Sequence, residues 1–581
     1  MTMSAHDSPR TPLMSPHPVS SQTFDGLFEV LARQPENSTA LAALQKGLRE
    51  GGPEAAACYQ EFKPVCHAAL TAVLQHHGHF ANEVRRLAAA QVCHRHQLHG
   101  GQVPVTVERL AALAADPLCT LMLAESINTN LTLEQFLTRA RTFLLRCHPG
   151  EPALLARLRP LLVALVQQVF NNEFVWPVTE AEELAVAALG EELMRTVQAG
   201  DNSRIEPLLL LHALYQPLAA HAEAARLAAM PLASFSGDLH PLLTRILHEP
   251  RREMELRATI PTLEEVRDPV SRSVRAQYEE SPYPRWVRFS RSRKSILQRI
   301  QSVRPGFEGP LAGSGQRLQV LVAGCGTGQH SLQVALGNPE ADVLAVDLSS
   351  ASLAYAMRMT ERHGARNLTF LQGDLLALPR LGRKFHHIEC AGVLHHIKDH
   401  AAAWAVLAQC LQPGGTMKIG VYSQAARLLV SHLRACIQRE GIGTSPNAVR
   451  LFRTRLLTEP AWAGLLPLLE RMGDFFSLSM TRDLLFHVQE HQYTVAEIEG
   501  IARALGLELL GVQLSRRSVD YLKSKGTLAE PRVQTFAQWR AIEQAYVGSL
   551  EMFQFWLQLP APAGPASAVA SLGRVRGAAS R

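Results

Sequence analysis

Three closely spaced glycines mark the part of the chain where ligand chemistry is expected. Gly324, Gly326 and Gly328 follow an apolar run at 320–323. An apolar run that stops in a glycine-rich turn predicts the first strand and ligand loop of a doubly wound sheet. Gly324 allows a sharp turn, and the other two glycines leave backbone open where a ligand must touch it. Asp347 ends a second apolar run about twenty residues on, where a carboxylate can accept hydrogen bonds from two ribose hydroxyls.

The glycine spacing separates two kinds of cofactor. A dinucleotide fingerprint requires G-x-G-x-x-G, and Gln329 stands where its third glycine would be. The pattern that remains is G-x-G-x-G. This spacing argues against a nicotinamide-dependent oxidoreductase.

The residues that follow predict the other elements that must position this loop. They are a third strand at 368–374, a fourth strand with its exit loop at 385–396, a helix at 401–411 and a fifth strand at 417–422. The third strand ends in Asp374, and the fourth exits through the pair His395-His396. Pro413 begins a Pro-Gly-Gly turn that cannot continue a helix, so it is expected to separate the helix from the fifth strand.

In this order the segment resembles class I S-adenosylmethionine (SAM)-dependent methyltransferases. Four further motifs, Y-E-x-x-P-Y-P-R-W, G-C-G-T-G-Q-H, V-L-H-H and F-H-V-Q-E-H, are similar to a bacterial family in which such an enzyme follows a helical, often tetratricopeptide-repeat, region. The resemblance covers roughly residues 130 to 515. It implies an α/β fold with a Rossmann-like class I methyltransferase core preceded by an all-α N-terminal domain. We find no clean repeat period in the helical region.

The resemblance also implies the cofactor, SAM, and the residues that bind it. These are Gly324, Cys325, Gly326, Thr327, Gly328, Asp347, Leu348, Gly373, Asp374, Leu375, Gly392 and Val393. In the family, the acidic residue at the position of Asp374 accepts a hydrogen bond from the adenine amino group. One position departs from the pattern: the family usually carries an acidic residue two positions before the first glycine, and this chain has Val322 there. That carboxylate normally helps to hold the loop or the amino group of the cofactor.

Methyl transfer from a sulfonium is an in-line displacement, so the protein must align the acceptor and remove any proton from it. His395 and His396 stand where the family places residues that face the methyl group. Tyr283 belongs to an aromatic, proline-rich segment at 276–286 that can form a lid over the cofactor or a rigid linker docked on the core. His487 follows in F-H-V-Q-E-H. These four residues are the predicted catalytic candidates.

The spacing His487-x-x-Glu490-His491 is also that of a zinc pattern. The two histidines are one helical turn apart, and a wall of the substrate pocket is the favoured interpretation. We therefore predict no metal. The family's N6-amine motif, Asn/Asp-Pro-Pro-Tyr/Phe, is absent after the fourth strand, which argues against methylation of adenine N6 or glutamine.

The composition of the whole chain limits the class of protein and the compartment to be expected. Its 581 residues are 47% hydrophobic with a net charge of +6, which fits a globular protein and is too small to imply nucleic acid. The nine cysteines show no C-x-x-C, and the chain lacks a long apolar run, so we expect a cytoplasmic protein without a membrane segment. The expected parts are a disordered leader at 1–21, an all-helical domain at 22–250, a linker and aromatic lid segment at 251–310, the SAM-binding core at 311–425, a C-terminal helical and substrate-side part at 426–559, and a disordered tail at 560–581.

The leading hypothesis is a SAM-dependent methyltransferase whose acceptor is a protein or a small molecule, with the helical region recruiting a protein partner. One alternative is an RNA methyltransferase that uses the basic stretch 285–304, although nucleic acid is not the favoured partner. The other is a SAM-binding scaffold without turnover. The identity of the acceptor and of its reacting atom stays open.

Overall fold

A seven-stranded sheet forms the centre of the second half of the chain. The computed structural model describes residues 23–51, 53–77, 82–99, 103–147, 151–266, 268–288, 294–309, 317–514, 516–524, 526, 532–545 and 552–561. Within them the strands are β1 (Leu318–Ala323), β2 (Ala341–Asp347), β3 (Leu368–Gln372), β4 (Phe385–Ala391), β5 (Leu411–Val421), β6 (Glu508–Gln513) and β7 (Phe553–Gln558). The predicted leader at 1–21 lies outside the described residues, as does the predicted tail beyond residue 561.

The strand order is β3-β2-β1-β4-β5-β7-β6. Strands β1 to β5 run parallel, and β7 is antiparallel to both of its neighbours, β5 and β6. In a doubly wound sheet the ligand crevice opens at the carboxyl ends of the strands, at the point where the strand order reverses. Here that point lies between β1 and β4. The predicted Rossmann-like class is confirmed.

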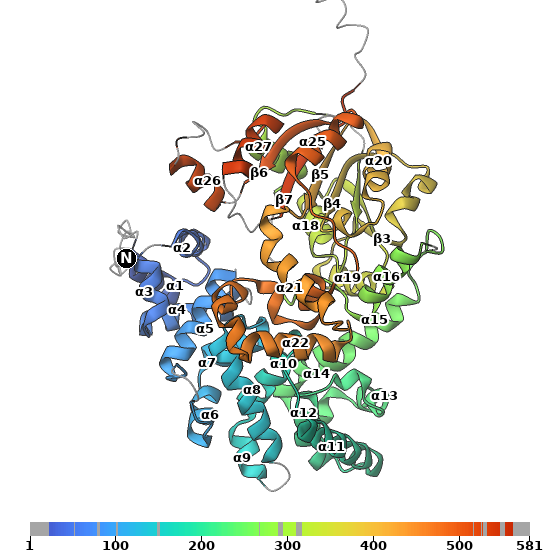
Figure 1. Ribbon diagram of the computed structural model, residues 1–581. Coiled ribbons are helices and arrows are strands. Elements are labelled where there is room, and N and C mark those ends of the chain that lie inside the picture. The colour runs from blue at the N-terminus through green and yellow to red at the C-terminus, as the bar shows by residue number, and fades with distance from the viewer. Residues whose placement is uncertain are drawn as a thin grey trace, which may run out of the picture.

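Helices cover both faces of the sheet (Figure 1). One face packs against α17 (Ile296–Val303), α18 (Gln329–Gly337) and α19 (Ser350–His363). The other packs against α20 (His400–Cys410), α25 (Val495–Ala504) and α27 (Phe536–Ala545). Because both faces are covered, β4 is buried along nearly its whole length, as expected for a central parallel strand.

The Pro-Gly-Gly segment departs from its prediction as a separate turn. Strand β5 begins at Leu411, directly after α20, so the segment lies inside this strand. Gly414 has a φ of 79°, a left-handed conformation that glycine adopts without steric cost. The pairing of β4 with β5 shifts register between Phe385 and His387, beside this irregular stretch. The glycines therefore shape a strand irregularity.

The N-terminal half is helical, which confirms the predicted all-α region. Its helices are α1 (Phe24–Arg33), α2 (Ser38–Glu50), α3 (Pro53–Gln60), α4 (Pro64–His77), α5 (Asn82–Arg95), α6 (Val107–Ala114), α7 (Pro117–Glu125), α8 (Leu131–Arg146), α9 (Pro152–Arg157), α10 (Arg159–Asn171), α11 (Glu180–Ala199), α12 (Asn202–Ala213), α13 (Ala224–Ala229), α14 (His240–Leu243) and α15 (Glu249–Arg257). No helix in the described ranges is both long and apolar enough to cross a bilayer.

Four helices from the second half of the chain join this N-terminal region. They are α21 (Leu428–Arg439), α22 (Pro446–Thr458), α23 (Leu466–Leu469) and α24 (Leu478–Phe486). Figure 1 shows α21 and α22 lying against the N-terminal helices, and their apolar side chains share one core with them. A buried ion pair crosses the contact, from Arg453 Nη1 to Glu134 Oε1 at 2.7 Å. We call α1–α15 together with α21–α24 the helical body.

Candidate functional site

The glycine loop between β1 and α18 is shaped by close contacts with protein. A Cβ at Gly324 would lie 2.2 Å from Val393 Cγ2, and one at Gly326 would lie 2.4 Å from the carbonyl oxygen of Tyr283. Both positions also have positive φ. The backbone of the aromatic segment therefore gives a further reason for glycine at 326, beside the predicted contact with a ligand.

Asp347 lies at the tip of β2 and closes the loop from the other side. Its Oδ2 accepts a hydrogen bond from Gly326 N at 2.8 Å, and its Oδ1 accepts one from Ser349 N at 2.9 Å. Burial raises the pKa of this carboxyl to about 6. Negative charge on nearby Glu279 acts in the same direction.

The aromatic segment, which continues from α16 (Pro269–Glu280), docks directly on the glycine loop. Thr327 N donates to the carbonyl oxygen of Tyr283 at 3.1 Å, and Thr327 Oγ1 donates to that of Pro284 at 2.6 Å. Trp286 Nε1 donates in turn to Thr327 Oγ1 at 3.0 Å. The segment is therefore a wall attached to the loop.

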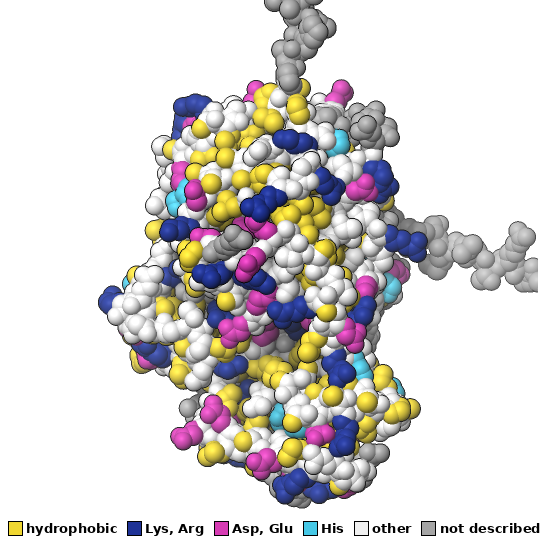
Figure 2. Space-filling view, turned by 90° about the vertical axis from the view of Figure 1, so that its right-hand side faces the viewer, with side chains coloured by type: hydrophobic (Ala, Val, Ile, Leu, Met, Phe, Trp, Pro, Cys, Tyr) yellow, Lys and Arg dark blue, Asp and Glu magenta, His cyan; other side chains and the backbone are white. Residues whose placement is uncertain are grey.

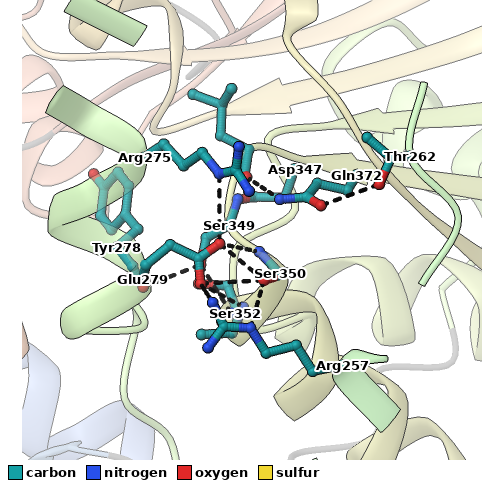
Figure 3. Close-up of polar contacts among 12 residues, drawn as sticks. Arg257, Thr262, Arg275, Tyr278, Glu279, Asp347, Ser349, Ser350, Ser352 and Gln372 are labelled. Carbon is teal, nitrogen blue, oxygen red and sulfur yellow. Dashed lines mark hydrogen bonds and ion pairs between the residues drawn. The ribbon is translucent and has the colours of Figure 1, made fainter. Parts of the chain in front are cut away.

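Glu279 attaches the same segment to the start of α19, as Figure 3 shows. Its carboxylate accepts hydrogen bonds from Ser350 N at 2.8 Å and Ala351 N at 3.2 Å, at the end of the helix where backbone N–H groups lack partners. Arg257 and Arg275 pair with it from outside, at 2.5 and 3.6 Å. Both the β1 loop and the β2 loop thus bind the segment.

A cavity of about 290 Å³ lies between these elements, at the carboxyl ends of the strands. Among the predicted cofactor residues, those that line it are Gly324, Cys325, Gly326, Asp347, Leu348, Gly373, Asp374, Leu375, Gly392 and Val393. Thr327 and Gly328 are not among its lining residues; the Thr327 side chain faces Pro284 and Trp286 instead. Tyr278, His330 and Lys398 line the cavity without having been predicted to bind the cofactor.

Two of the four catalytic candidates, Tyr283 and His396, line the cavity. His396 Nδ1 donates to the carbonyl oxygen of Gln489 at 2.8 Å, so the lone pair of this ring resides on Nε2. Burial lowers the pKa of His396 to about 4. The ring is consequently neutral near pH 7, and its Nε2 can accept a hydrogen bond.

His395 does not reach the cavity. Its ring is fully buried and stacks on Tyr422 with ring centroids 3.9 Å apart. Neither ring nitrogen has a hydrogen-bond partner among the described residues, and burial lowers the pKa of this imidazole well below its usual range. His395 therefore lies on the core side of the pair, and His396 on the cavity side.

His487 lies directly behind His396, with ring centroids 3.6 Å apart. Its Nδ1 accepts a hydrogen bond from Gln489 N at 3.1 Å, so its Nε2 carries the proton and donates to the hydroxyl of Tyr278 at 3.1 Å. That hydroxyl donates to Asp483 Oδ1 at 2.7 Å. Tyr278 is thus a cavity residue fixed by its partners, and its place in the Y-E-x-x-P-Y motif was the signal that could have identified it.

The three residues of the zinc-like spacing do not come together at one point. Helix α24 ends at Phe486, so His487 and His491 do not share a helical turn. Glu490 binds Arg427, and His491 Nε2 lies 2.7 Å from Glu497. His487 does come close to His396 and Asp483, but a metal on its Nε2 would require a proton on Nδ1, which already accepts from Gln489 N. The donor set at this cluster does not fit a metal ion.

The sequence of the strand-and-loop region matches a known family model. Residues 320–415 match the model described as "Methyltransferase domain". This region is a class I SAM-dependent methyltransferase domain. The uncharacterized protein syc1184_c of Synechococcus sp. is 31% identical over 39% of this chain and 55% of its own length. The trans-aconitate 2-methyltransferase of Deinococcus radiodurans is 37% identical over 18% of this chain and 37% of its own length.

Among solved structures, PKMT2 from Rickettsia typhi in complex with AdoHcy is 18% identical, with a TM-score of 0.36 over 48% of this chain and 55% of that chain. The chain spans about half the length of the first of the curated relatives and just over a third of the second. The residues matched by the family model, 320–415, run from β1 to the start of β5, and β6, β7 and the helical body lie outside them.

Proposed function

We propose that this protein transfers a methyl group from SAM to an acceptor that meets the cavity beside Tyr283 and His396. SAM supplies a methyl group already activated by a sulfonium, so the chain must bind, align and exclude water. The observation that supports this function is that the glycine loop, Asp347 and His396 all line one cavity. It brings a predicted ribose-binding carboxylate and a neutral imidazole to one space.

The donor and acceptor groups of the cavity suit this cofactor. A carboxylate offers about four lone-pair sites, so Asp347 keeps acceptor capacity for two ribose hydroxyls after binding Gly326 N and Ser349 N. Asp374 accepts from Leu376 N through Oδ1 at 2.9 Å, which leaves Oδ2 for an adenine amino group. The two carboxylates would hold the two ends of the nucleoside.

His396 is the residue we assign to the proton of the acceptor. Its Nε2 lone pair and its neutral state allow it to accept a hydrogen bond from the attacking group. His487 stacks on its outer face, and the chain of hydrogen bonds through Tyr278 to Asp483 fixes His487. These neighbours act by positioning the ring.

We infer that the acceptor approaches from the side of the helical body. A second cavity of about 430 Å³ lies between that body and the aromatic segment. The body contributes Glu125, Ser126 and Asp474 to its lining, and the segment contributes Pro284 and Trp286. Pro284 and Gln329 line both cavities, so they form the partition between them. This arrangement supports a role for the helices in admitting a small molecule or in holding a protein partner.

RNA is less well supported as the acceptor. In the basic stretch 285–304, Arg285 lies over the rings of Phe170 and Tyr355, Arg288 binds Glu125, and Arg299 binds Glu389. These arginines are engaged inside the protein. On the face shown in Figure 2, basic and acidic side chains are interspersed, without the one-sign stripe that phosphate backbones favour.

All nine cysteines are free, which favours a cytoplasmic location.

The first experiment is calorimetric titration with SAM and S-adenosylhomocysteine, using Asp347→Ala as the control. We expect micromolar binding that the substitution abolishes. A labelled-methyl assay on lysate, split into nuclease-treated and protease-treated portions, then assigns the acceptor class. Absence of binding by the wild-type chain would contradict the proposal. Binding with no transfer to any fraction would favour a scaffold that holds SAM without turnover.

A further inference from the structure

A buried carboxylate on β4 lies beside the position where the family pattern expects one on β1. Glu389 is 1% exposed and is the direct partner of Val322 in the parallel pairing of β4 with β1. Partners in a parallel ladder point to the same face of the sheet. The Glu389 carboxylate is thus next to the Val322 side chain, and Val322 lines the cofactor cavity.

Cationic side chains surround this carboxylate. His330 Nε2 lies 2.5 Å from Glu389 Oε2, Arg299 Nη1 lies 3.2 Å from Oε1, and Lys418 Nζ lies 4.0 Å from Oε2. Burial alone would raise the pKa of Glu389, but His330 and Arg299 hold it well below its usual range. One ionised carboxylate therefore faces the Arg299 guanidinium and the Lys418 amine, in addition to the His330 ring.

Within this cluster, His330 alone lines the cavity. Its side chain keeps 31% of its surface exposed, whereas Glu389 behind it is sealed. His330 is the second residue of α18 (Gln329–Gly337), at the helix end that carries partial positive charge. The ring therefore faces the cavity from the start of a helix, and Arg299 and Lys418 lie behind it.

We propose that His330 binds the α-carboxylate of the amino-acid tail of the cofactor, and that Glu389 is a positioning residue that holds the ring. An imidazolium donates from both of its nitrogens, so His330 can join Glu389 through Nε2 to a second carboxylate through Nδ1. The inference rests on the proposed function, because it names the subsite of that same cavity. It explains how the loop serves the tail without an acidic residue at 322.

The charge balance selects the carboxylate over the α-ammonium group of the same tail. Arg299 and Lys418 repel a cation, and the α18 N-terminus repels it too. A ligand carboxylate gains from all three. The missing acid on β1 and the cations on α17 and β5 thus act in the same direction, and this wall of the cavity favours an anion.

The test compares three ligands by calorimetry on the full chain. S-adenosylhomocysteine has the whole tail, its decarboxylated analogue S-adenosyl-3-thiopropylamine keeps only the amine, and 5′-methylthioadenosine lacks both groups. We expect His330→Asn to weaken S-adenosylhomocysteine binding about tenfold, the effect of one charge-assisted hydrogen bond, while the other two ligands bind as to the wild type. His386→Asn, the same change at a histidine of β4 that does not line the cavity, should leave all three unchanged.

The outcomes separate this inference from the proposed function. If the wild-type chain binds none of the three ligands, the proposed function fails together with the inference. If it binds them and His330→Asn weakens all three equally, His330 has only a structural role and the inference is overturned. Weakening of both amine-containing ligands, with methylthioadenosine unaffected, would assign His330 to the ammonium group and would also overturn it.

Glu389→Gln tests the positioning residue. The amide keeps the size of the side chain but lacks the charge that faces His330. We expect the affinity for S-adenosylhomocysteine to fall while methylthioadenosine binds normally, which also shows that the cavity is still folded. An unchanged ratio of the two affinities in a folded Glu389→Gln protein would contradict the positioning role.

Discussion

At the residue scale, the site depends on buried titratable groups held in one protonation state. Asp347 at the β2 tip has its pKa raised to about 6 by burial, and His396 has its pKa lowered to about 4 by the same cause. Near pH 7 the first is therefore charged and the second neutral. These are the states that a ribose-binding acceptor and a proton acceptor require, and each can be tested separately.

Ligand affinity should depend on pH through Asp347. Below pH 6 the carboxyl gains a proton and loses acceptor capacity, so we expect the affinity for S-adenosylhomocysteine to fall by up to about tenfold per pH unit. Above pH 6 the affinity should level off. Titration calorimetry between pH 5 and 8 measures this, and Asp347→Asn should bind weakly with no such dependence. A pH-independent wild type would contradict the assignment.

His396→Asn should lower the rate of methyl transfer by about 10²- to 10⁴-fold, the usual contribution of a positioned proton acceptor. The affinity for S-adenosylhomocysteine should stay within about twofold. The matched variant is His395→Asn at the neighbouring buried ring, which should lower the melting temperature and leave the turnover of the folded protein largely intact. A reversal of these two effects would exchange the roles of the histidines.

At the element scale, the aromatic segment and the glycine loop form one unit. Thr327 binds the backbone of Tyr283 and Pro284, and Glu279 binds the start of α19. Because the contact uses backbone atoms, a side chain added at Gly326 must displace the segment. The wall that contains Tyr278 and Tyr283 would move with it.

Gly326→Ala should therefore disrupt the site more than an ordinary left-handed glycine replacement. The new Cβ would overlap the Tyr283 carbonyl oxygen, and φ at this position is 52°. We expect loss of cofactor binding and a lower melting temperature. Gly364→Ala is the control, because Gly364 has a φ of 70° and no atom lies within 4 Å of the added Cβ. This substitution should lower the free energy of unfolding by only about 1–2 kcal/mol. Equal effects of the two substitutions would contradict the docking argument.

At the scale of the whole molecule, the chain leaves the sheet after β5, passes through the helical body and then returns to the sheet. Helices α21 to α24 follow β5 and share the hydrophobic core of the N-terminal helices before β6 and β7 complete the sheet. Glu173 adds to this contact by accepting from Ser479 N at 2.9 Å. The second half of the chain therefore supplies part of the hydrophobic core of the helical body.

Breaking the buried pair Arg453–Glu134 should destabilise the whole protein. Glu134→Ala leaves an uncompensated guanidinium among buried side chains, which costs about 3–5 kcal/mol. We expect a single, earlier unfolding transition by differential scanning calorimetry. Arg455→Ala, at a partly exposed arginine on the same helix, should change the melting temperature little. Two separate transitions in the Glu134→Ala protein would show that the halves unfold independently.

The sequence alone was sufficient to predict the methyltransferase core, because its signals are local. An apolar run followed by glycines, with Asp347 at the next strand tip, depends on backbone conformations and spacings that lie within a few residues of each other. The same reasoning selected His396, which lines the cavity. It could not distinguish His396 from His395, because adjacent residues look alike in sequence and only packing against Tyr422 and Gln489 separates them.

Only the tertiary structure decided which distant residues meet. Glu389 stands opposite Val322 because β4 pairs with β1, and no local pattern specifies that register. His487 contacts Tyr278 although the two residues are more than two hundred positions apart in the sequence. The residues of the zinc-like spacing do not lie on one helical turn, because α24 ends at Phe486. Local propensity determines elements and loops, whereas the site depends on pairing and burial between elements, and these form only when the whole chain packs.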